Sequence, residues 1–332
     1  MTDIHRDHRV DWIRAICSLS VILAHVGAPF AINQIRTFDV VSLVFISGVS
    51  LAYSKKKKYG EYIWQRIKKL LFPTYIVIAS VFVLSYMACS ILHIKQLYSN
   101  NQIMRSFLLL NNGSMGYVWI VRIYLCIAVL SPLLKTVAQK LDSKWKLFAF
   151  SAVNVLIGYG MYYIGLVIQD GWIKDFYVDY IFSSFVYSII VILGAWNHAN
   201  KHAHRNMLIG TLVVFIAMQV VMCLNGTGFA PGIYKFPPRL YYVVYGLLCT
   251  YILYAVLPNK KAVPIEWISK NSFMIYLFHI IVLRIYGLVT KIPAIKFMDD
   301  RWIIKYLVVT CGAIIMVAVW NKMNAEWARR KQ

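Results

Sequence analysis

Long apolar segments recur along the whole chain, and most are long enough to form a helix that crosses a lipid bilayer. A helix rises about 1.5 Å per residue, so about 20 mostly apolar residues cross the hydrocarbon layer. Charge clusters and Gly, Pro or Asn turns separate ten such segments, at residues 12–30, 38–53, 70–92, 116–136, 147–167, 177–196, 206–224, 239–257, 272–289 and 302–320. None shows the strict alternation of a membrane barrel strand. We therefore predict an all-α, polytopic membrane protein with about ten transmembrane helices.

The charge of the chain is strongly basic and unevenly distributed. Hydrophobic residues make up 60% of the sequence and charged residues 14%, which excludes an ordinary soluble domain. A formal charge of +22 would suggest a nucleic-acid partner in a soluble protein. Counting Lys135 and Arg239, which lie at segment ends, with the adjoining loops, the two termini and the alternate loops on their side hold 22 Lys and Arg, whereas the opposite loops hold 9. By the positive-inside rule both termini are cytoplasmic, and no nucleic-acid partner is expected.

The largest basic cluster, Lys55 to Lys58, is interpreted as a topogenic signal that also attracts lipid phosphate. No signal peptide precedes the first segment, so we expect that helix to be retained. Residues 1–332 are predicted to form a single transmembrane domain without an appended soluble domain, which confines any catalysis to the helices and their short loops. All six cysteines fall in apolar segments without metal-ligand spacing, so we predict core packing and no metal site.

Ionisable residues inside the first segment are functional candidates, because such groups cost several kcal/mol in the bilayer unless they are paired or face water. Arg14 and His25 are eleven residues apart, which is three turns plus about 20°, so they share one helix face with Ser18. His25 is expected about 16 Å deeper than Arg14, in the middle of the bilayer. Asp11 is predicted to pair with Arg14 at the membrane surface. Asp39, in the second segment, is a candidate to orient His25 or raise its basicity.

A cation at the membrane surface and an imidazole deeper in the protein suit a thioester acyl donor such as acetyl-CoA. The donor's phosphates need Arg or Lys, and its long arm would carry the acyl group from Arg14 towards His25. A histidine can take a proton from a sugar hydroxyl near neutral pH. The competing interpretation is a packed, hydrogen-bonded histidine, and the alignment with Arg14 favours the functional one.

Two further groups of residues are candidates for substrate contacts. Ser272, Tyr276 and His279 are spaced by four and three residues, so they line one face of the ninth segment. They are predicted to position the acceptor or complete the donor site, with interhelical hydrogen bonds as the structural alternative. In the fourth segment Trp119 precedes Arg122 by one turn. The indole is a candidate for sugar stacking or for an interface anchor, and Arg122 for binding the acyl donor.

Several motifs resemble those of the acyltransferase-3 family of membrane-bound O-acyltransferases. In that family an Arg, ten residues and then a His lie on the first helix, as Arg14 and His25 do here. Similar elements follow in the family's order along the whole chain, namely FDVVSLVFISG at 38–48, VWIVRIY at 118–124 and NSFMIYLFH at 271–279. The resemblance implies the same ten-helix fold.

One motif departs from the family pattern. Where the family often has Arg-x-x-Arg ahead of a Pro-Tyr pair, this chain has Arg66 and Lys69, followed by Pro73 and Tyr75. Lys69 keeps the positive charge but lacks the two-pronged geometry of a guanidinium group. Attraction of phosphate is therefore expected to survive, and positive-inside topology is the alternative explanation for both residues.

The resemblance implies transfer of an acyl group, usually acetyl, from cytoplasmic acyl-CoA to a hydroxyl of a cell-envelope polysaccharide or its lipid-linked precursor, in the bacterial inner membrane. Arg14, Arg66 and Lys69 would then attract the CoA phosphates. His25 would be the catalytic base or would handle the acyl group, supported by Asp39.

Other functions stay open on sequence grounds. The same fold would accept succinyl or another acyl donor, and the protein would act alone or pass the acyl group to a separate partner. A glycan or ion transporter would also use buried charges, although we detect no inverted repeat of the kind common in transporters. The acceptor sugar, the leaflet of transfer and the oligomeric state are not determined by the sequence.

Overall fold

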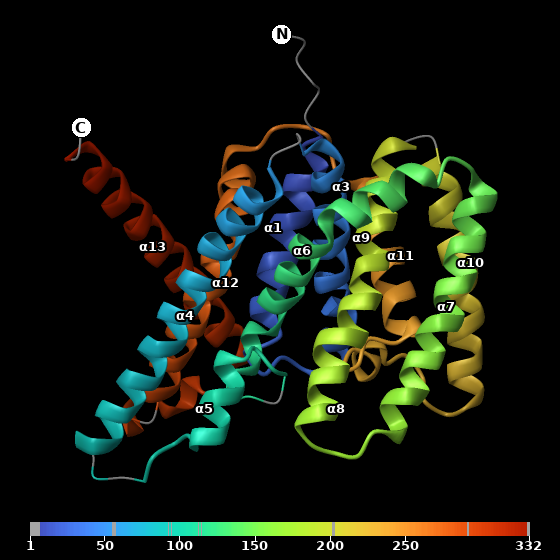
Figure 1. Cartoon of the computed structure of the whole chain (residues 1–332). Helices are drawn as coiled ribbons and strands as arrows, with labels where there is room; N and C mark the ends of the chain where they lie inside the picture. The colour runs from blue at the N-terminus through green and yellow to red at the C-terminus, as the bar shows by residue number, and fades with distance from the viewer. Residues whose placement is uncertain are drawn as a thin grey trace. The chain divides into compact units, whose positions relative to one another are not determined.

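The computed structural model describes residues 7–54, 58–91, 93, 95–111, 113, 115–200, 203–290 and 292–330, and all regular structure in these residues is helical. Residues 55–57 of the basic cluster lie outside them. The α-helices are α1 (Arg9–Leu23), α2 (Phe30–Ile35), α3 (Asp39–Tyr53), α4 (Tyr59–Ile91), α5 (Asn100–Phe107), α6 (Trp119–Lys140), α7 (Lys144–Val167), α8 (Trp172–Phe176), α9 (Ser183–Ala199), α10 (His204–Leu224), α11 (Leu240–Val256), α12 (Val263–Val289) and α13 (Trp302–Arg329), as labelled in Figure 1. Short 3₁₀ turns are η1 (Arg36–Phe38), η2 (Gly116–Val118), η5 (Pro231–Tyr234) and η6 (Pro293–Met298), and η3 (Tyr177–Phe182) is a π-helical turn.

Eight helical stretches among the described residues are long and apolar enough to cross a membrane: 30–53, 59–91, 119–140, 144–167, 172–199, 204–224, 263–289 and 302–329. The other two predicted segments are shorter helices, α1 with 15 residues and α11 with 17 residues. The prediction of an all-α, multi-pass membrane protein is confirmed, although only eight of the ten predicted segments reach the length of a full span.

The first two predicted boundaries were wrong. We expected one helix over 12–30, but α1 ends at Leu23 and a turn follows it. Gly27 in this turn takes a φ of +77°, which is left-handed backbone that glycine adopts easily, and Pro29 follows it. The second span, expected at 38–53, begins earlier, because α2, η1 and α3 run head to tail over residues 30–53.

The chain divides into two units that are described separately. The first comprises residues up to Asp39 together with those from Val256 onwards. In this unit α1 packs against α12 and α13, and α12 packs along α13 (Figure 1). The Nδ2 of Asn321 on α13 donates to the Oδ1 of Asn271 on α12 at 2.8 Å, which ties these two helices together.

The second unit comprises Val40–Ala255. Here α6 packs against α9 and α4. Helices α3 and α9 approach each other backbone to backbone, since a Cβ added to Gly48 would lie 2.1 Å from the carbonyl oxygen of Val191, and one added to Gly194 would lie 2.1 Å from that of Phe45. The small residues allow this close approach, as is common between helices in membranes.

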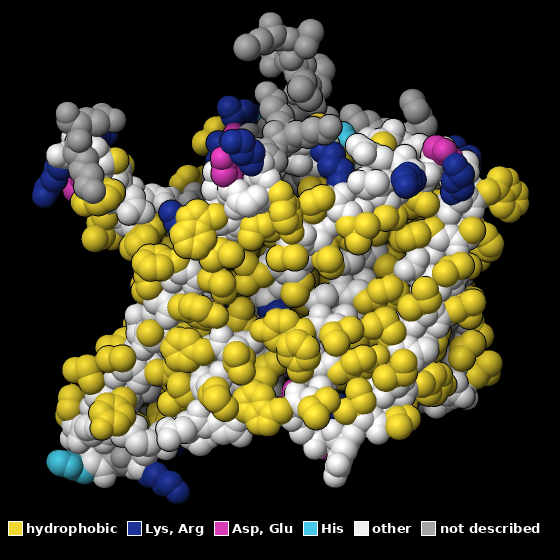
Figure 2. Space-filling view, viewed as in Figure 1, with side chains coloured by type: hydrophobic (Ala, Val, Ile, Leu, Met, Phe, Trp, Pro, Cys, Tyr) yellow, Lys and Arg dark blue, Asp and Glu magenta, His cyan; other side chains and the backbone are white. Residues whose placement is uncertain are grey.

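Large hydrophobic side chains are exposed along several of the long helices, and Figure 2 shows them over the face in view. In the most apolar 18-residue stretch of α10 no residue is buried. In the corresponding stretch of α7 only 6% of the residues are buried. Such exposed apolar surfaces are suited to contact with lipid.

The predicted core packing of the cysteines is correct for Cys17 and Cys89. It is wrong for Cys223 and Cys311, which lie on exposed faces of α10 and α13.

Candidate functional site

A buried hydroxyl joins the two charged residues at the start of the first helix. The Oγ of Ser269 on α12 donates to the Oδ1 of Asp11 at 2.7 Å and accepts from the Nη1 of Arg14 at 3.3 Å. A hydroxyl has one proton and two lone pairs, so it can serve both partners at once. Asp11 and Ser269 are buried, whereas Arg14 is partly exposed. Ser269, a residue that we did not predict, therefore links Asp11 with Arg14, and a direct pair between these two residues stays a prediction.

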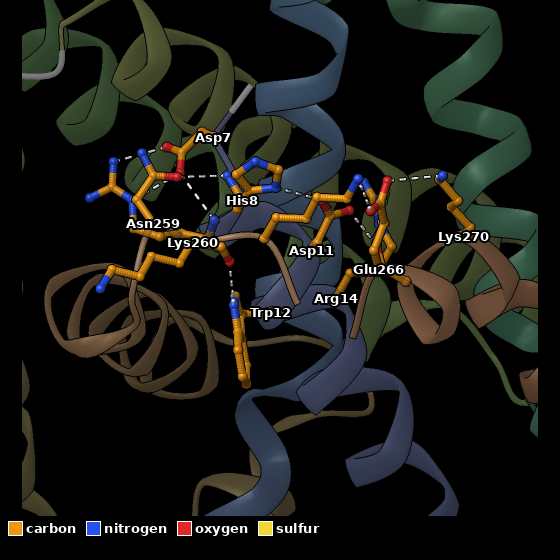
Figure 3. Close-up of polar contacts among 12 residues, drawn as sticks. Asp7, His8, Asp11, Trp12, Arg14, Asn259, Lys260, Glu266 and Lys270 are labelled. Carbon is orange, nitrogen blue, oxygen red and sulfur yellow. Dashed lines mark hydrogen bonds and ion pairs between the residues drawn. The ribbon is translucent and has the colours of Figure 1, made fainter. Parts of the chain in front are cut away.

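Further polar contacts fix this end of α1 against the segment that leads into α12 (Figure 3). The backbone N–H of His8 donates to the Oδ1 of Asn259 at 2.8 Å, and the indole N–H of Trp12 donates to the carbonyl of Lys260 at 3.2 Å. The Nδ1 of His8 lies 3.9 Å from the Oδ2 of Asp11. These contacts come from backbone and side chains on both sides of Asp11, so the first turns of the helix are held in one orientation.

Two histidines stack beyond the other end of α1. The rings of His25 and His279 have centroids 5.4 Å apart and planes 17° apart. His25 lies in the turn after α1, not on the helix as predicted, and it is partly exposed. His279 on α12 is fully buried, and its Nδ1 contacts the carbonyl oxygen of Tyr276. The sequence had placed His25 and His279 in separate candidate groups, and the structure brings them together.

Asp39 is fully buried at the start of α3, where its Oδ2 accepts from the Nη1 of Arg36 at 2.7 Å. Arg36 therefore supplies a charge partner that we had not anticipated. The predicted support of His25 by Asp39 stays a prediction.

The remaining candidates on α12 lie on one face, as their spacing indicated. Tyr276 is buried with its ring centroid 5.6 Å from that of His279, and Ser272 is partly exposed. Ser269 continues the same spacing by one more turn. This continuation was the signal in the sequence that would have identified Ser269 as a member of the site.

A second polar cluster lies in the other unit, around Arg122 on α6. Arg122 is 1% exposed, its Nη1 is 3.2 Å from the Oδ2 of Asp179, and it donates to the carbonyl of Leu109 at 2.6 Å. Asn111 donates to both oxygens of Asp179, from its backbone N–H at 2.9 Å and from its Nδ2 at 2.5 Å. The guanidinium carbon also lies 5.1 Å from the ring centre of Tyr180.

Arg122 therefore has a buried counter-ion, which sequence analysis missed. Asp179 lies within the sixth predicted segment, and the cost of an intramembrane carboxylate should have marked it as Arg122 was marked. Because a carboxylate compensates the guanidinium charge, a structural role fits Arg122 better than donor binding. The predicted contact with the acyl donor stays a prediction.

Trp119 is buried among aromatic and basic side chains of the same unit. Its ring meets that of Phe236 edge to face at 5.1 Å, and the Nζ of Lys235 lies 5.6 Å from its centre. The indole is only 7% exposed, so in this arrangement its surface is used for packing. Sugar stacking by Trp119 stays a prediction.

Arg66 and Lys69 lie near the beginning of α4, and both are exposed. The guanidinium carbon of Arg66 is 5.2 Å from the ring centre of Tyr62, one turn earlier on the same helix. At 33 residues α4 is about 50 Å long, which exceeds the thickness of the hydrocarbon layer. The two cations therefore sit on a part of the helix that can reach lipid headgroups or water.

The first unit thus combines an anchored arginine and a pair of stacked imidazoles, one of them partly accessible. Imidazoles exchange protons near neutral pH, and a guanidinium binds phosphate or carboxylate groups. This combination supports transfer of a group from an anionic donor to an acceptor that loses a proton.

Comparison with known proteins identifies one family. The sequence model of the acyltransferase-3 family, described as an acyltransferase domain, matches residues 7–322. No curated protein and no solved structure matches the chain.

Proposed function

Since the chain belongs to the acyltransferase-3 family and forms several apolar helices of membrane-spanning length, we propose that it is a multi-pass membrane acyltransferase of the bacterial inner membrane. In this proposal it moves an acetyl group from cytoplasmic acetyl-CoA to a hydroxyl of a cell-envelope polysaccharide or its lipid-linked precursor. The observation that carries the proposal is the stack of His25 on His279 in the unit that also holds Arg14 anchored by Ser269.

His25 is the proposed base. Its imidazole accepts the proton of the acceptor hydroxyl while the hydroxyl oxygen attacks the thioester carbonyl carbon. The carbon–sulfur bond then breaks, and the CoA thiolate leaves and takes up the proton from the imidazolium. Partial exposure of His25 supports this role, because a base that becomes transiently charged needs contact with water or polar groups.

Arg14 is proposed to bind the phosphates of the donor. Its side chain is partly exposed, and Ser269 accepts from its Nη1 at 3.3 Å, which holds the guanidinium group in place. Arg66 and Lys69, at exposed positions on α4, are proposed to attract CoA phosphates electrostatically. Ser272 and Tyr276 are proposed to line the acceptor side.

Acetyl transfer by the purified full-length chain in proteoliposomes tests the proposal. Radiolabelled acetyl-CoA and deacetylated envelope glycan from the source organism are supplied, and label in the glycan is counted. We expect transfer by the wild-type chain and at least about a 100-fold loss in His25→Ala, which is the usual contribution of an acid–base group.

The matched control is His204→Ala. His204 is also a partly exposed histidine packed on an aromatic ring, with its centroid 5.2 Å from that of Tyr251, but it lies in the second unit. We expect it to keep most of the activity. Wild-type rates of acetylation in His25→Ala would refute the role of His25 as the base. Movement of glycan or ions across the membrane without acetylation would identify a transporter instead. Competition by succinyl-CoA measures donor preference in the same assay.

A further inference from the structure

His279 presents a buried nitrogen whose hydrogen bonding is incomplete. The residue is 0% exposed, and its Nε2 has no hydrogen-bond partner among the described residues. A buried polar atom left without a partner destabilises a folded protein, so each such atom calls for an explanation. This nitrogen was not singled out by the spacing that predicted His279 as a substrate contact.

The other ring nitrogen determines what the free one can do. The Nδ1 of His279 contacts the carbonyl oxygen of Tyr276, and a carbonyl oxygen can only accept a hydrogen bond. The proton of the neutral ring therefore lies on Nδ1, assigned from this contact, and the Nε2 carries a lone pair. The unpartnered atom is an acceptor, so it needs a donor such as a hydroxyl.

Burial separates the roles of the two stacked histidines. Full burial makes it costly for His279 to take a charge, whereas His25 is partly exposed. A second positive charge beside a protonated His25 would be repelled at a ring separation of 5.4 Å. His279 is therefore suited to stay neutral and accept a hydrogen bond while His25 gains and loses the proton.

The stacking also limits what can engage both rings. Ring nitrogens form hydrogen bonds in the plane of the ring, and the two planes are separated and only 17° from parallel. One hydroxyl has a single proton to donate, so it cannot serve an acceptor nitrogen on both rings, and each ring requires its own hydroxyl. Two hydroxyls on neighbouring carbons are the smallest sugar fragment that offers this pair.

We propose that the Nε2 of His279 accepts a hydrogen bond from the acceptor hydroxyl adjacent to the one that His25 deprotonates, so that the enzyme selects acceptors with neighbouring hydroxyls. This inference rests on the proposed function. Because His279 is sealed in this structure, a rearrangement of the turn that carries His25 must admit the acceptor. Among the described residues other than its two chain neighbours, none has an atom within 4 Å of the position that a Cβ on Gly27 in that turn would take, which leaves room for such a movement.

Competition with two small alcohols tests the selection. Acetylation of the deacetylated glycan is measured with trans-1,2-cyclohexanediol or cyclohexanol as inhibitor, since these differ by one hydroxyl. For the wild-type chain we expect the diol to inhibit at about tenfold lower concentration, the usual value of one additional hydrogen bond. Equal inhibition by both alcohols would overturn the inference while leaving the proposed function intact, whereas no acetyl transfer in any condition would overturn the proposed function.

Three substitutions distinguish hydrogen bonding to the Nε2 lone pair of His279 from packing of its ring. His279→Gln keeps an acceptor near the position of Nε2, His279→Asn keeps only the group near Nδ1, and His279→Phe keeps only the ring. We expect the KM for the glycan to rise about tenfold in the Asn and Phe variants and less in the Gln variant, with the KM for acetyl-CoA nearly unchanged. The diol preference should disappear in the Phe variant.

Two further results would contradict this role. Wild-type behaviour of His279→Phe would assign the ring to packing alone. Nitrogen-15 NMR of the histidine-labelled full chain reads the tautomer without any acyl donor, and a proton on the Nε2 of His279 would remove the acceptor on which the inference depends. Thermal unfolding of each variant in detergent identifies any that fail to fold, and His204→Gln serves as the matched substitution outside the stack.

Discussion

The buried charge of Arg122 is compensated by a partner that lies far away in the chain. Arg122 and Asp179 are 1% and 4% exposed, and Asn111 completes the hydrogen bonding of the carboxylate. Removing a charge from such a pair leaves the other uncompensated in a low-dielectric environment, which costs more than the pair itself contributes. The pair is therefore expected to matter more for folding than its single ionic contact suggests.

Asp179→Ala is expected to destabilise the protein by about 3–5 kcal/mol, because it leaves the guanidinium of Arg122 buried without a counter-ion. The double variant Arg122→Met with Asp179→Leu should recover most of this loss. The free energy of unfolding of the full chain in mixed micelles measures both effects.

The control for this prediction is Asp142→Ala, which removes an ion pair of 2.7 Å with Lys146 on the surface. Both side chains of that pair are more than half exposed, so its loss should cost less than about 1 kcal/mol. If Asp179→Ala and Asp142→Ala lowered the free energy of unfolding equally, the prediction that the buried pair matters more for folding than a surface pair would be wrong.

Helix packing in the second unit depends on glycines at close contacts. Gly48 on α3 and Gly194 on α9 each face the backbone of the other helix, at positions where a Cβ would lie 2.1 Å from a carbonyl oxygen. A methyl group there cannot be accommodated by rotating a side chain, so the helices would have to separate. The contact determines which faces of α3 and α9 turn towards each other.

Gly194→Ala is therefore expected to destabilise the protein by about 1–3 kcal/mol, as overpacking usually does. Gly210→Ala on α10 is the matched control, since a Cβ there meets no atom of the described neighbouring residues within 4 Å. In a helix that substitution should be neutral or stabilising by up to about 1 kcal/mol. Thermal unfolding in detergent compares the two variants, and equal stability would exclude the tight packing of α3 on α9.

At the scale of the whole molecule, the number of membrane crossings decides where the termini lie. In the part of the chain that the structure describes, eight helical stretches reach full spanning length, and α1 and α11 are shorter, with 15 and 17 residues. If both shorter helices cross, or neither does, the termini lie on the same side of the membrane. If only one crosses, they lie on opposite sides. The excess of Lys and Arg on the side of the termini favours the cytoplasm for both.

Fusions of green fluorescent protein to the N-terminus and, separately, to the C-terminus test this topology in a bacterial inner membrane. We expect both fusions to fluoresce, because both termini are predicted to be cytoplasmic. Alkaline phosphatase fused at the same positions should be inactive. A dark C-terminal fusion with active phosphatase would show that one of the two short helices does not cross.

Sequence periodicity identified faces of helices but not the partners of those faces. It placed Ser272, Tyr276 and His279 on one face of α12, and it missed that Ser269 on the same face bridges Asp11 and Arg14. It marked Arg122 as an unusual intramembrane charge without indicating Asp179. Rotation and register between helices decide such pairs, and these follow from packing that is not local in the chain.

By itself the sequence determined the class of the protein, the approximate positions of its helices and the family to which it belongs. These properties depend on local quantities, namely the length of apolar runs, the charges between them and short motifs such as Arg14 followed by His25. Only the tertiary structure decided that His25 stacks on His279, and that Arg14 is held by a hydroxyl 255 positions away. The physical reason is that the free energy of these contacts comes from desolvated side chains on different helices, which meet only after the helices have packed.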